Sequence, residues 1–325
     1  MKFLSNVIKQ LPEYKRLSEC LDFSPAAAAA AGLTTVHKAH IIHALCAEKG
    51  VRAFVVASDE AEAQTLANDL SSMGGKALVY PVRDFTFRDV NSQSREYEHK
   101  RLNVLSKMLR GDYTAVIACI DAAIQYTIPP SALRDATVRF QSGGRLPLEQ
   151  AVRVLTLNGY ERCEQVEGPG QFAVRGGILD FFMPDAQAPV RAEFWGDEID
   201  TLNYFDVETQ RRTDYIEELT LTPSTELLIG DAEKLAAKIE HKASLLRGKT
   251  AAQARTVLQR ESDSLRNGVR PGSMDKFIGL LYDSPGSLFD YNDKKDLLFL
   301  LEPVKTNERL RAYNRLFEEE LQDCF

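Results

Sequence analysis

The sequence predicts an α/β protein in which a parallel sheet with crossover helices carries an inserted, mainly antiparallel β domain and a helical subdomain. Two short apolar runs of the buried parallel-strand type, 51–56 and 115–120, alternate with helix-like runs at 60–73 and 95–109. From about residue 145 the pattern changes to short alternating runs separated by Gly, Pro and Asp turns, which is typical of hairpins. The chain is therefore expected to contain two kinds of sheet.

The last third of the sequence is helical, with one exception. Residues 231–267 are rich in helix-forming residues, and a charged helix is predicted over 306–322. Between them, 296–303 contains one more apolar run, which predicts a further buried strand. That strand needs a sheet, and the first segment provides one, so the β domain is expected to interrupt a split α/β body. The expected domains are an α/β domain at 1–130, a β domain at 131–228 and a helical subdomain at 229–325, with a strand near 297–302 returning to the first sheet.

Length and composition describe a globular protein of two or three domains. The 325 residues are 44% hydrophobic and 27% charged, and no apolar run is long enough to span a bilayer. The first residues show no signal-peptide pattern and the five cysteines are scattered, which together predict a reducing, cytoplasmic location. The net charge of -7 is opposite to that of most dedicated nucleic-acid binders, so we expect weak DNA binding at most.

Alternation in the β domain separates a core face from an outer face. Along 190–195 the three apolar residues are predicted to face the core, which places Arg191, Glu193 and Trp195 together on the other face. By the same rule Arg175 points away from the core. Trp and Arg are side chains that anchor protein interfaces. Two interpretations remain open on this evidence, a solvated surface and an interface with a partner.

The charges around this strand favour a protein partner over nucleic acid. From 159 to 215 the sequence holds five arginines, no lysine and twelve acidic residues. Isolated arginines in acidic surroundings suit bidentate pairing with carboxylates better than contact with a phosphate backbone.

Three blocks of this region resemble a known family. They are 170–182, which contains Arg175-Gly176-Gly177, then 190–200, and then Phe205-Asp206 with 209–211. Over about forty residues their order and spacing resemble the second domain of UvrB and of the bacterial transcription-repair coupling factors (Mfd). The Arg-Gly-Gly-Ile-Leu-Asp and Thr-Gln-Arg forms are closer to the coupling factors.

The resemblance implies that the β domain docks onto the repair protein UvrA. The docking arginines and glutamate of the family match Arg162, Arg191 and Glu193, and Arg162 is expected to approach from the preceding connection. Together with Arg175 and Trp195 they form the predicted UvrA-binding site. A further UvrB arginine, two positions before the Arg-Gly pair, is Ala173 here, so similar but not identical docking chemistry is expected.

The first segment resembles the RecA-like first domain of UvrB, but its nucleotide site is degenerate. On the pattern Gly-x4-Gly-Lys-Ser/Thr, Gly32 and Thr34 remain, whereas Ala27 stands at the first glycine and Leu33 at the lysine. The lysine supplies positive charge to the phosphates and the glycines let backbone N–H groups surround them. Leucine does neither.

The acidic half of such a site is reduced as well. Glu302 is the one carboxylate after the late strand, and Pro303 follows it. Lys38 lies a full helical turn beyond the lysine position, so it is interpreted as a solvated helix residue and not as a displaced phosphate ligand. We expect no catalytic residue, no bound nucleotide and no cofactor in this chain.

Two other features are expected to be structural. Phe85 and Phe87 stand where UvrB carries a DNA-clamping hairpin, but the next helix follows too closely for a long hairpin, which argues against damage recognition. His37, His40 and His43 recur every three residues on one predicted helix and would fan out over more than about 100°, so no metal site is expected.

Two functions compete. The first is a catalytically silent module that recruits UvrA where transcription has stalled. The alternative is an active UvrB-like, ATP-dependent helicase domain that binds damaged DNA. The degenerate nucleotide site and the missing hairpin favour the first. The resemblance places the family's ATP- and Mg-dependent translocase motor, and its contacts with RNA polymerase and double-stranded DNA, in other domains of the longer proteins.

Overall fold

The computed structural model describes residues 7–23, 27–83, 95–248, 251–271 and 274–324. The chain divides into two compact units. The first comprises Met1–Val82, Lys107–Gln125 and Tyr291–Arg315, and the second comprises Arg83–Ser106, Tyr126–Asp290 and Leu316–Phe325. Phe85 and Phe87 lie outside the described residues.

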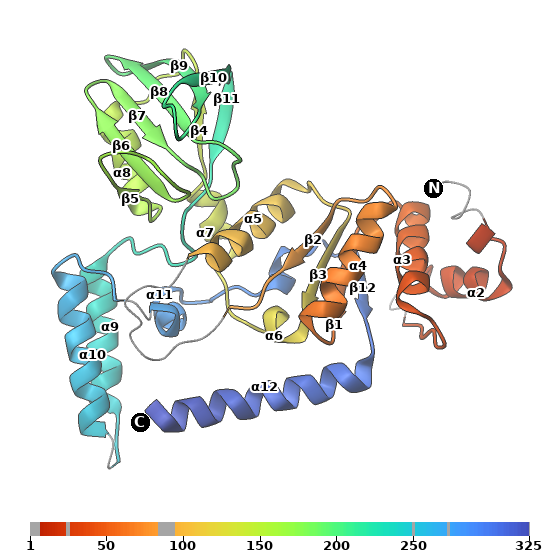
Figure 1. Ribbon diagram of the computed structural model, residues 1–325. Helices are drawn as coiled ribbons and strands as arrows, with labels where there is room; N and C mark the ends of the chain where they lie inside the picture. The colour runs from red at the N-terminus through yellow and green to blue at the C-terminus, as the bar shows by residue number, and fades with distance from the viewer. Residues whose placement is uncertain (1–6, 24–26, 84–94, 249–250, 272–273, 325) are drawn as a thin grey trace. The chain divides into compact units, whose positions relative to one another are not determined.

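A four-stranded parallel sheet forms the centre of the first unit. Its order is β12-β1-β3-β2. The strands are β1 (Ala53–Ala57), β2 (Ala77–Tyr80), β3 (Ala115–Cys119) and β12 (Leu297–Leu300). The expected return of the late strand to this sheet is confirmed, because β12 pairs with β1 (Figure 1). The expectation that β12 is buried is wrong on one face, where Leu298 and Leu300 are exposed, since β12 is an edge strand.

Helices pack against this sheet because apolar residues recur along one side of each. Residues Ile42 of α3 and Leu66 of α4 meet Val55 and Ile117 of the sheet in one buried cluster. Asp59 begins α4 by accepting a hydrogen bond from the backbone N–H of Glu62. The helices that lie in this unit, wholly or in part, include α2 (Pro12–Cys20), α3 (Thr35–Lys49), α4 (Glu60–Ser72), α6 (Ile120–Ala123) and α12 (Pro303–Cys324), and the end of α5 (Glu96–Arg110) also belongs to it.

The β domain lies in the second unit and is built on a six-stranded sheet. The order is β10-β9-β8-β7-β6-β5, with every neighbouring pair antiparallel except β5 and β6. A two-stranded sheet of β4 and β11 and the helix α8 contribute to the same core. The elements are β4 (Val138–Gln141), α8 (Leu148–Leu157), β5 (Glu161–Arg162), β6 (Gln171–Arg175), β7 (Ile178–Phe181), β8 (Val190–Trp195), β9 (Glu198–Phe205), β10 (Arg212–Tyr215) and β11 (Glu218–Leu221).

Two hydrophobic clusters hold the β domain together. The larger one joins Phe172, Phe181 and Val190 of the six-stranded sheet to Phe140 and Leu155. The smaller one contains Val166, Ala173, Phe182 and Phe205. Ala173 alternates with Phe172 along β6, so the two clusters occupy opposite faces of the sheet.

The rest of the second unit is helical. The run expected over 231–267 is two helices, α9 (Ala232–Leu245) and α10 (Ala251–Arg266), which lie side by side (Figure 1). Arg266 near the end of α10 binds Glu233 and Glu240 of α9, as an antiparallel pair requires. The other helical elements are α5 (Glu96–Arg110, shared with the first unit), α7 (Pro130–Asp135), η1 (Met274–Phe277), α11 (Ile278–Leu281) and η2 (Leu288–Tyr291). Within the described residues, no helix is both long and apolar enough to cross a bilayer.

Candidate functional site

Strand β8 has the two faces that its sequence predicts. Val190 and Ala192 are buried in the larger cluster and Phe194 packs against it. Arg191, Glu193 and Trp195 therefore share the other face. Trp195 is 85% exposed and stands at the end of the strand, before the Gly196 turn.

Arg191 on this face is an internal residue and not an exposed one, which corrects the expectation from alternation alone. Its Nε and Nη2 donate to Oδ1 and Oδ2 of Asp180 at 2.7 and 2.8 Å, and only 14% of its side chain is exposed. The guanidinium also lies over the ring of Phe205, 4.6 Å from the centroid. Hydrogen bonding to Asp180 raises the pKa of Arg191 above its ordinary value.

Gln210 completes the surroundings of Arg191. Its backbone oxygen accepts from Nη1 at 3.0 Å, and its own φ is 58°, a left-handed conformation that is uncommon for residues other than glycine. Asp180, Arg191 and Gln210 belong to the three separate sequence blocks that resemble the family. The structure thus brings those blocks together at one guanidinium.

The outer part of this face includes four charged or aromatic side chains. Glu193 pairs with Arg212 of β10, and Arg175, at the end of β6, is two strands from Glu193 in the same row. Trp195 follows Glu193 by two positions on the same strand. We call Arg175, Glu193, Trp195 and Arg212 the docking face.

Arg162 does not join this face. It lies on β5, the edge strand three places from β8, and its register partner is Phe172 of the larger cluster. The next residue, Cys163, packs in the smaller cluster with Ala173. By alternation Arg162 therefore takes the side opposite to Arg175 and Arg191, and the expected approach from the preceding connection is not what the structure shows.

The departure at Ala173 has a structural explanation. Its side chain is buried against Val166, Phe182 and Phe205. An arginine at this position would stand opposite Asp180, which Arg191 already binds, and it would have to displace that apolar cover.

The residues of the degenerate nucleotide site lie in the first unit. Ala27, Gly32 and Thr34 are exposed, and Leu33 is half-buried, directly before α3. Gly32 has a φ of 77°. Leucine at the lysine position offers no positive charge to a phosphate.

Lys38 is a cation at this end of the sheet, and the expectation that it is solvated is wrong. Its Nζ donates to Glu302 Oε1 at 2.7 Å and to Glu62 Oε1 at 3.0 Å, and 13% of its side chain is exposed. Burial disfavours the charge on Lys38, but its hydrogen bonds to Glu302 and Glu62 raise its pKa above the ordinary value. The same bond to Lys38 lowers the pKa of Glu302.

The three histidines of α3 have separate surroundings. His37 Nδ1 lies 3.1 Å from the Thr34 hydroxyl and His40 Nδ1 lies 2.9 Å from the Val36 carbonyl oxygen. The pKa of His43 is lowered, mainly by burial. In the part of the chain that the structure describes, no three His, Cys, Asp or Glu side chains are grouped in a way that could hold a metal ion.

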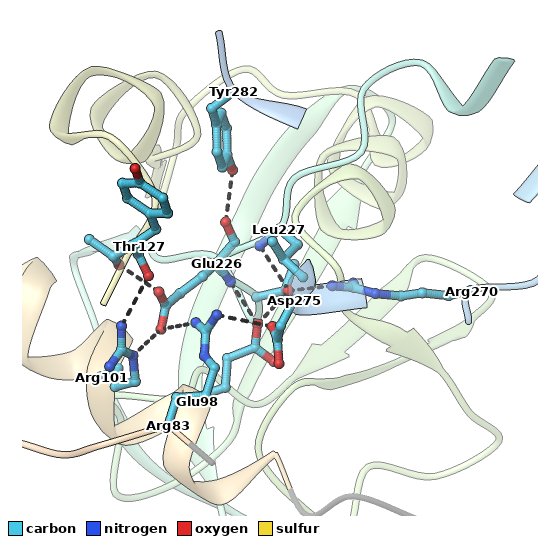
Figure 2. Close-up of polar contacts among 11 residues, drawn as sticks. Arg83, Glu98, Arg101, Thr127, Glu226, Leu227, Arg270, Asp275 and Tyr282 are labelled. Carbon is cyan, nitrogen blue, oxygen red and sulfur yellow. Dashed lines mark hydrogen bonds and ion pairs between the residues drawn. The ribbon is translucent and has the colours of Figure 1, made fainter. Parts of the chain in front are cut away.

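A buried polar cluster in the second unit was not predicted from the sequence. Glu226 is fully buried, and one carboxylate oxygen lies 2.7 Å from both Arg101 Nε and Arg83 Nη2 (Figure 2). The other accepts from the Thr127 hydroxyl at 2.5 Å. Burial opposes the charge on Glu226, but Arg101 and Arg83 lower its pKa to about 2.

A second set of hydrogen bonds surrounds the neighbour of Glu226. Thr225 donates its hydroxyl to Glu98 at 2.6 Å and accepts from Arg270 at 2.7 Å. Tyr282 donates to the Glu226 carbonyl oxygen at 2.8 Å. The irregular segment between β11 and α9 is thereby fixed from several parts of the second unit. In the sequence, Glu226 is only a charged residue beside two leucines, and this pattern is too common to identify a buried cluster.

Comparison with known proteins agrees with these features. Residues 138–227 match the family described as the UvrB interaction domain. The chain is 28% identical over 332 residues to the transcription-repair-coupling factor of Bacillus subtilis, covering 99% of this chain and 27% of that protein. It is 28% identical over 307 residues to the same factor from Myxococcus xanthus, covering 89% of this chain and 25% of that protein.

The matched domain contains β4–β11, and with it the whole docking face. The chain spans about a quarter of the length of these curated relatives. The chain is therefore similar over most of its length to the bacterial transcription-repair-coupling factors, and its residues 138–227 match the UvrB interaction domain.

Proposed function

We propose that this chain is a non-catalytic, cytoplasmic module that recruits UvrA for transcription-coupled nucleotide excision repair. The relationship to transcription-repair-coupling factors supports a role in this kind of DNA repair. The observation that carries the proposal is Trp195, an 85% exposed aromatic beside charged side chains within the UvrB interaction domain. An exposed Trp with flanking arginines is the composition of a protein interface anchor.

The docking face has separate parts for contact and for support. Trp195 would enter an apolar pocket on UvrA, and Arg175 would pair with a UvrA carboxylate. Glu193 and Arg212, already paired with each other, would supply a polar rim. Arg191 is held by Asp180 and Gln210 and so would keep β8 in place for its neighbours.

A role without nucleotide is part of the proposal. Leu33 brings no charge to a phosphate, and Lys38 already binds the carboxylate that a magnesium ion would need. We assign the ATP-driven translocase, the RNA polymerase contacts and the double-stranded DNA contacts of the full-length relatives to regions beyond these residues. The alternative of an active helicase domain would require the charges that this site lacks.

Binding to purified UvrA tests the proposal directly. The wild-type chain should bind UvrA, and Trp195→Ala should weaken binding by about 2 kcal/mol, or about thirtyfold, with an unchanged thermal midpoint. Tyr97→Ala is the matched control, since Tyr97 is an exposed aromatic on α5, outside the matched domain. Equal binding by wild type and Trp195→Ala would contradict the proposed contact, and no binding by wild type would overturn the function.

Titration with labelled ATP and Mg²⁺ tests the non-catalytic part. We expect no micromolar binding and no hydrolysis that follows the purified chain. Turnover that a Glu302→Gln substitution abolishes would instead support the helicase alternative.

A further inference from the structure

The carboxyl ends of β1, β3 and β12 form the edge at which open α/β sheets bind their ligands. Acidic residues follow each of these strands at this edge. Asp59 and Glu62 follow β1, Asp121 follows β3, and Glu302 follows β12. A ligand can bind at this edge only if these carboxylates are not already paired with other groups of the chain.

Glu302 and Glu62 are both held in fixed positions. The N–H of Leu301 donates to the Val56 carbonyl oxygen at 2.9 Å, which anchors the end of β12, and Glu302 then adopts a left-handed φ of 43°. Such a conformation is strained for glutamate and persists where surrounding contacts fix it. Glu62 receives two hydrogen bonds from Ser58 on Oε2, from the backbone N–H at 3.1 Å and from the hydroxyl at 2.8 Å.

Lys38 lies between these two carboxylates. Its ammonium binds one oxygen of each, at 2.7 and 3.0 Å, and the side chains of Lys38 and Glu62 are mostly buried. Two carboxylate oxygens converging on one cation is the arrangement by which proteins hold a divalent ion such as Mg²⁺ or Mn²⁺. Here the cation is part of the chain.

The neighbouring acid at this edge is neutralised in the same way. Asp121, which is almost completely buried, pairs with Arg309 of α12 at 2.6 Å. Asp59 is used as the cap of α4. Each of these four acids is thus already committed to a partner from the chain itself.

We infer that Lys38 is a built-in substitute for a divalent metal ion, which closes the ligand-binding edge of the first sheet from within. A metal ion between Glu62 and Glu302 would have to displace the ammonium. The inference concerns a site in the first unit and stands independently of UvrA binding. It predicts that removing the ammonium uncovers a metal site that the wild-type chain does not offer.

The experiment compares wild type with Lys38→Met in the complete chain, with Mn²⁺ as the probe. Lys38→Met leaves two negative charges facing each other, so its thermal midpoint should fall by about 4 °C. Millimolar Mn²⁺ should restore most of that loss, because it binds the folded variant only. Electron paramagnetic resonance should count one more bound Mn²⁺ on the variant than on wild type.

Three further variants make the result specific. Lys38→Arg keeps the charge and should not respond to Mn²⁺. Lys38→Met combined with Glu302→Gln loses one carboxylate and should also not respond. Lys100→Met is the matched surface control, since Lys100 pairs with Glu96 on an exposed part of α5.

The outcomes separate clearly. A Mn²⁺ response confined to Lys38→Met supports the inference, as does a Lys38→Met chain that folds only when Glu302→Gln is added. An equal Mn²⁺ response in wild type would overturn it, because the carboxylates would then be open. A Lys38→Met chain with the wild-type thermal midpoint and no extra bound Mn²⁺ would overturn it too. So would failure of both Lys38→Met and Lys38→Met with Glu302→Gln to fold, because Lys38 would then have a packing role.

Discussion

Arg191 and Asp180 stand directly opposite each other on β8 and β7 and are joined by two parallel hydrogen bonds of 2.7 and 2.8 Å. The aspartate side chain is 2% exposed and the arginine side chain 14% exposed. A pair so placed belongs to the interior of the domain, although its arginine lies on the strand face that a partner would meet.

Truncating Arg191 should therefore unfold the β domain more easily. Removing one member of a buried pair leaves the other charge without compensation, so Arg191→Ala should lower the free energy of unfolding by about 3 kcal/mol. Urea unfolding measures this. Arg175→Ala is the matched control, because Arg175 is exposed and its loss should change stability by less than about 0.5 kcal/mol. Equal stability of the two variants would show that the Arg191 pair contributes nothing.

The placement of Arg162 leads to a second prediction. Arg175 belongs to the docking face, whereas Arg162 lies on the edge strand β5 with the opposite orientation. If UvrA contacts one face only, Arg175→Ala should weaken UvrA binding about tenfold and Arg162→Ala less than about threefold. Surface plasmon resonance measures UvrA binding by both variants, once their thermal midpoints have been shown to be similar. An equal or larger loss for Arg162→Ala would mean that the contact extends around the β5 edge.

Glu226 gives the second unit a defined dependence on pH. Its pKa in the folded chain is about 2, held down by Arg101 and Arg83 against the effect of burial, and thus below the value of about 4.3 in an unfolded chain. Because the folded-state pKa of Glu226 is lowered, its charged form stabilises the folded chain. This contribution is complete above about pH 4.3 and is lost as the pH falls towards 2. The shift corresponds to a contribution on the order of 3 kcal/mol at neutral pH. Burial raises the pKa of the neighbouring Asp275, so its titration has the opposite sign.

Urea unfolding of wild type and Glu226→Gln between pH 7 and pH 3 checks this. The variant should be much less stable at pH 7, and the difference should shrink as the pH falls. Glu240→Gln, which removes an exposed partner of Arg266, should have a much smaller effect. A difference between wild type and Glu226→Gln that stays constant over this range would contradict the assignment.

Gly159 marks a close approach between a turn and the buried segment. Its φ is +80°, and an added Cβ would lie 2.3 Å from Thr225 Cγ2. Thr225 is fixed by Glu98 and Arg270, so Gly159→Ala should cost about 2 kcal/mol or more. Gly168→Ala is the control, because nothing lies within 4 Å of its added Cβ. Adding Thr225→Ser, which removes the clashing methyl, should recover part of the loss; thermal midpoints that show no recovery would argue against the clash.

The elements were easier to predict than the partners of individual charges. Apolar runs located β1, β3 and β12, because buried strands differ from helices in length and composition. β2 was missed, since its four residues are too few to show a pattern. The inward side of β8 followed from alternation, and the exposure of Trp195 with it.

Pairing depends on register and on distant segments, which alternation does not contain. Arg191 meets Asp180 only because β7 and β8 pair in one particular register. Lys38 meets Glu302 across 264 positions of sequence, so its helix pattern alone indicated a solvated lysine. Alternation therefore placed Arg175, Glu193 and Trp195 on the outer face of the sheet, but it could not show that Arg191 and Lys38 are held in mostly buried ion pairs.

The pairing of β1 with β12 has a consequence for how the protein is made. Arg52 and Asp296, which bind each other at the start of these strands, are 244 positions apart. On the ribosome β1 emerges long before β12, so one edge of the growing sheet stays without its partner while the second unit is synthesised. Domains generally fold as units during synthesis, and long-range strand pairing is slow. The β domain, whose strands β4–β11 are all made before β12, can thus acquire its structure first, while the edge of β1 stays open until residue 300 has left the exit tunnel.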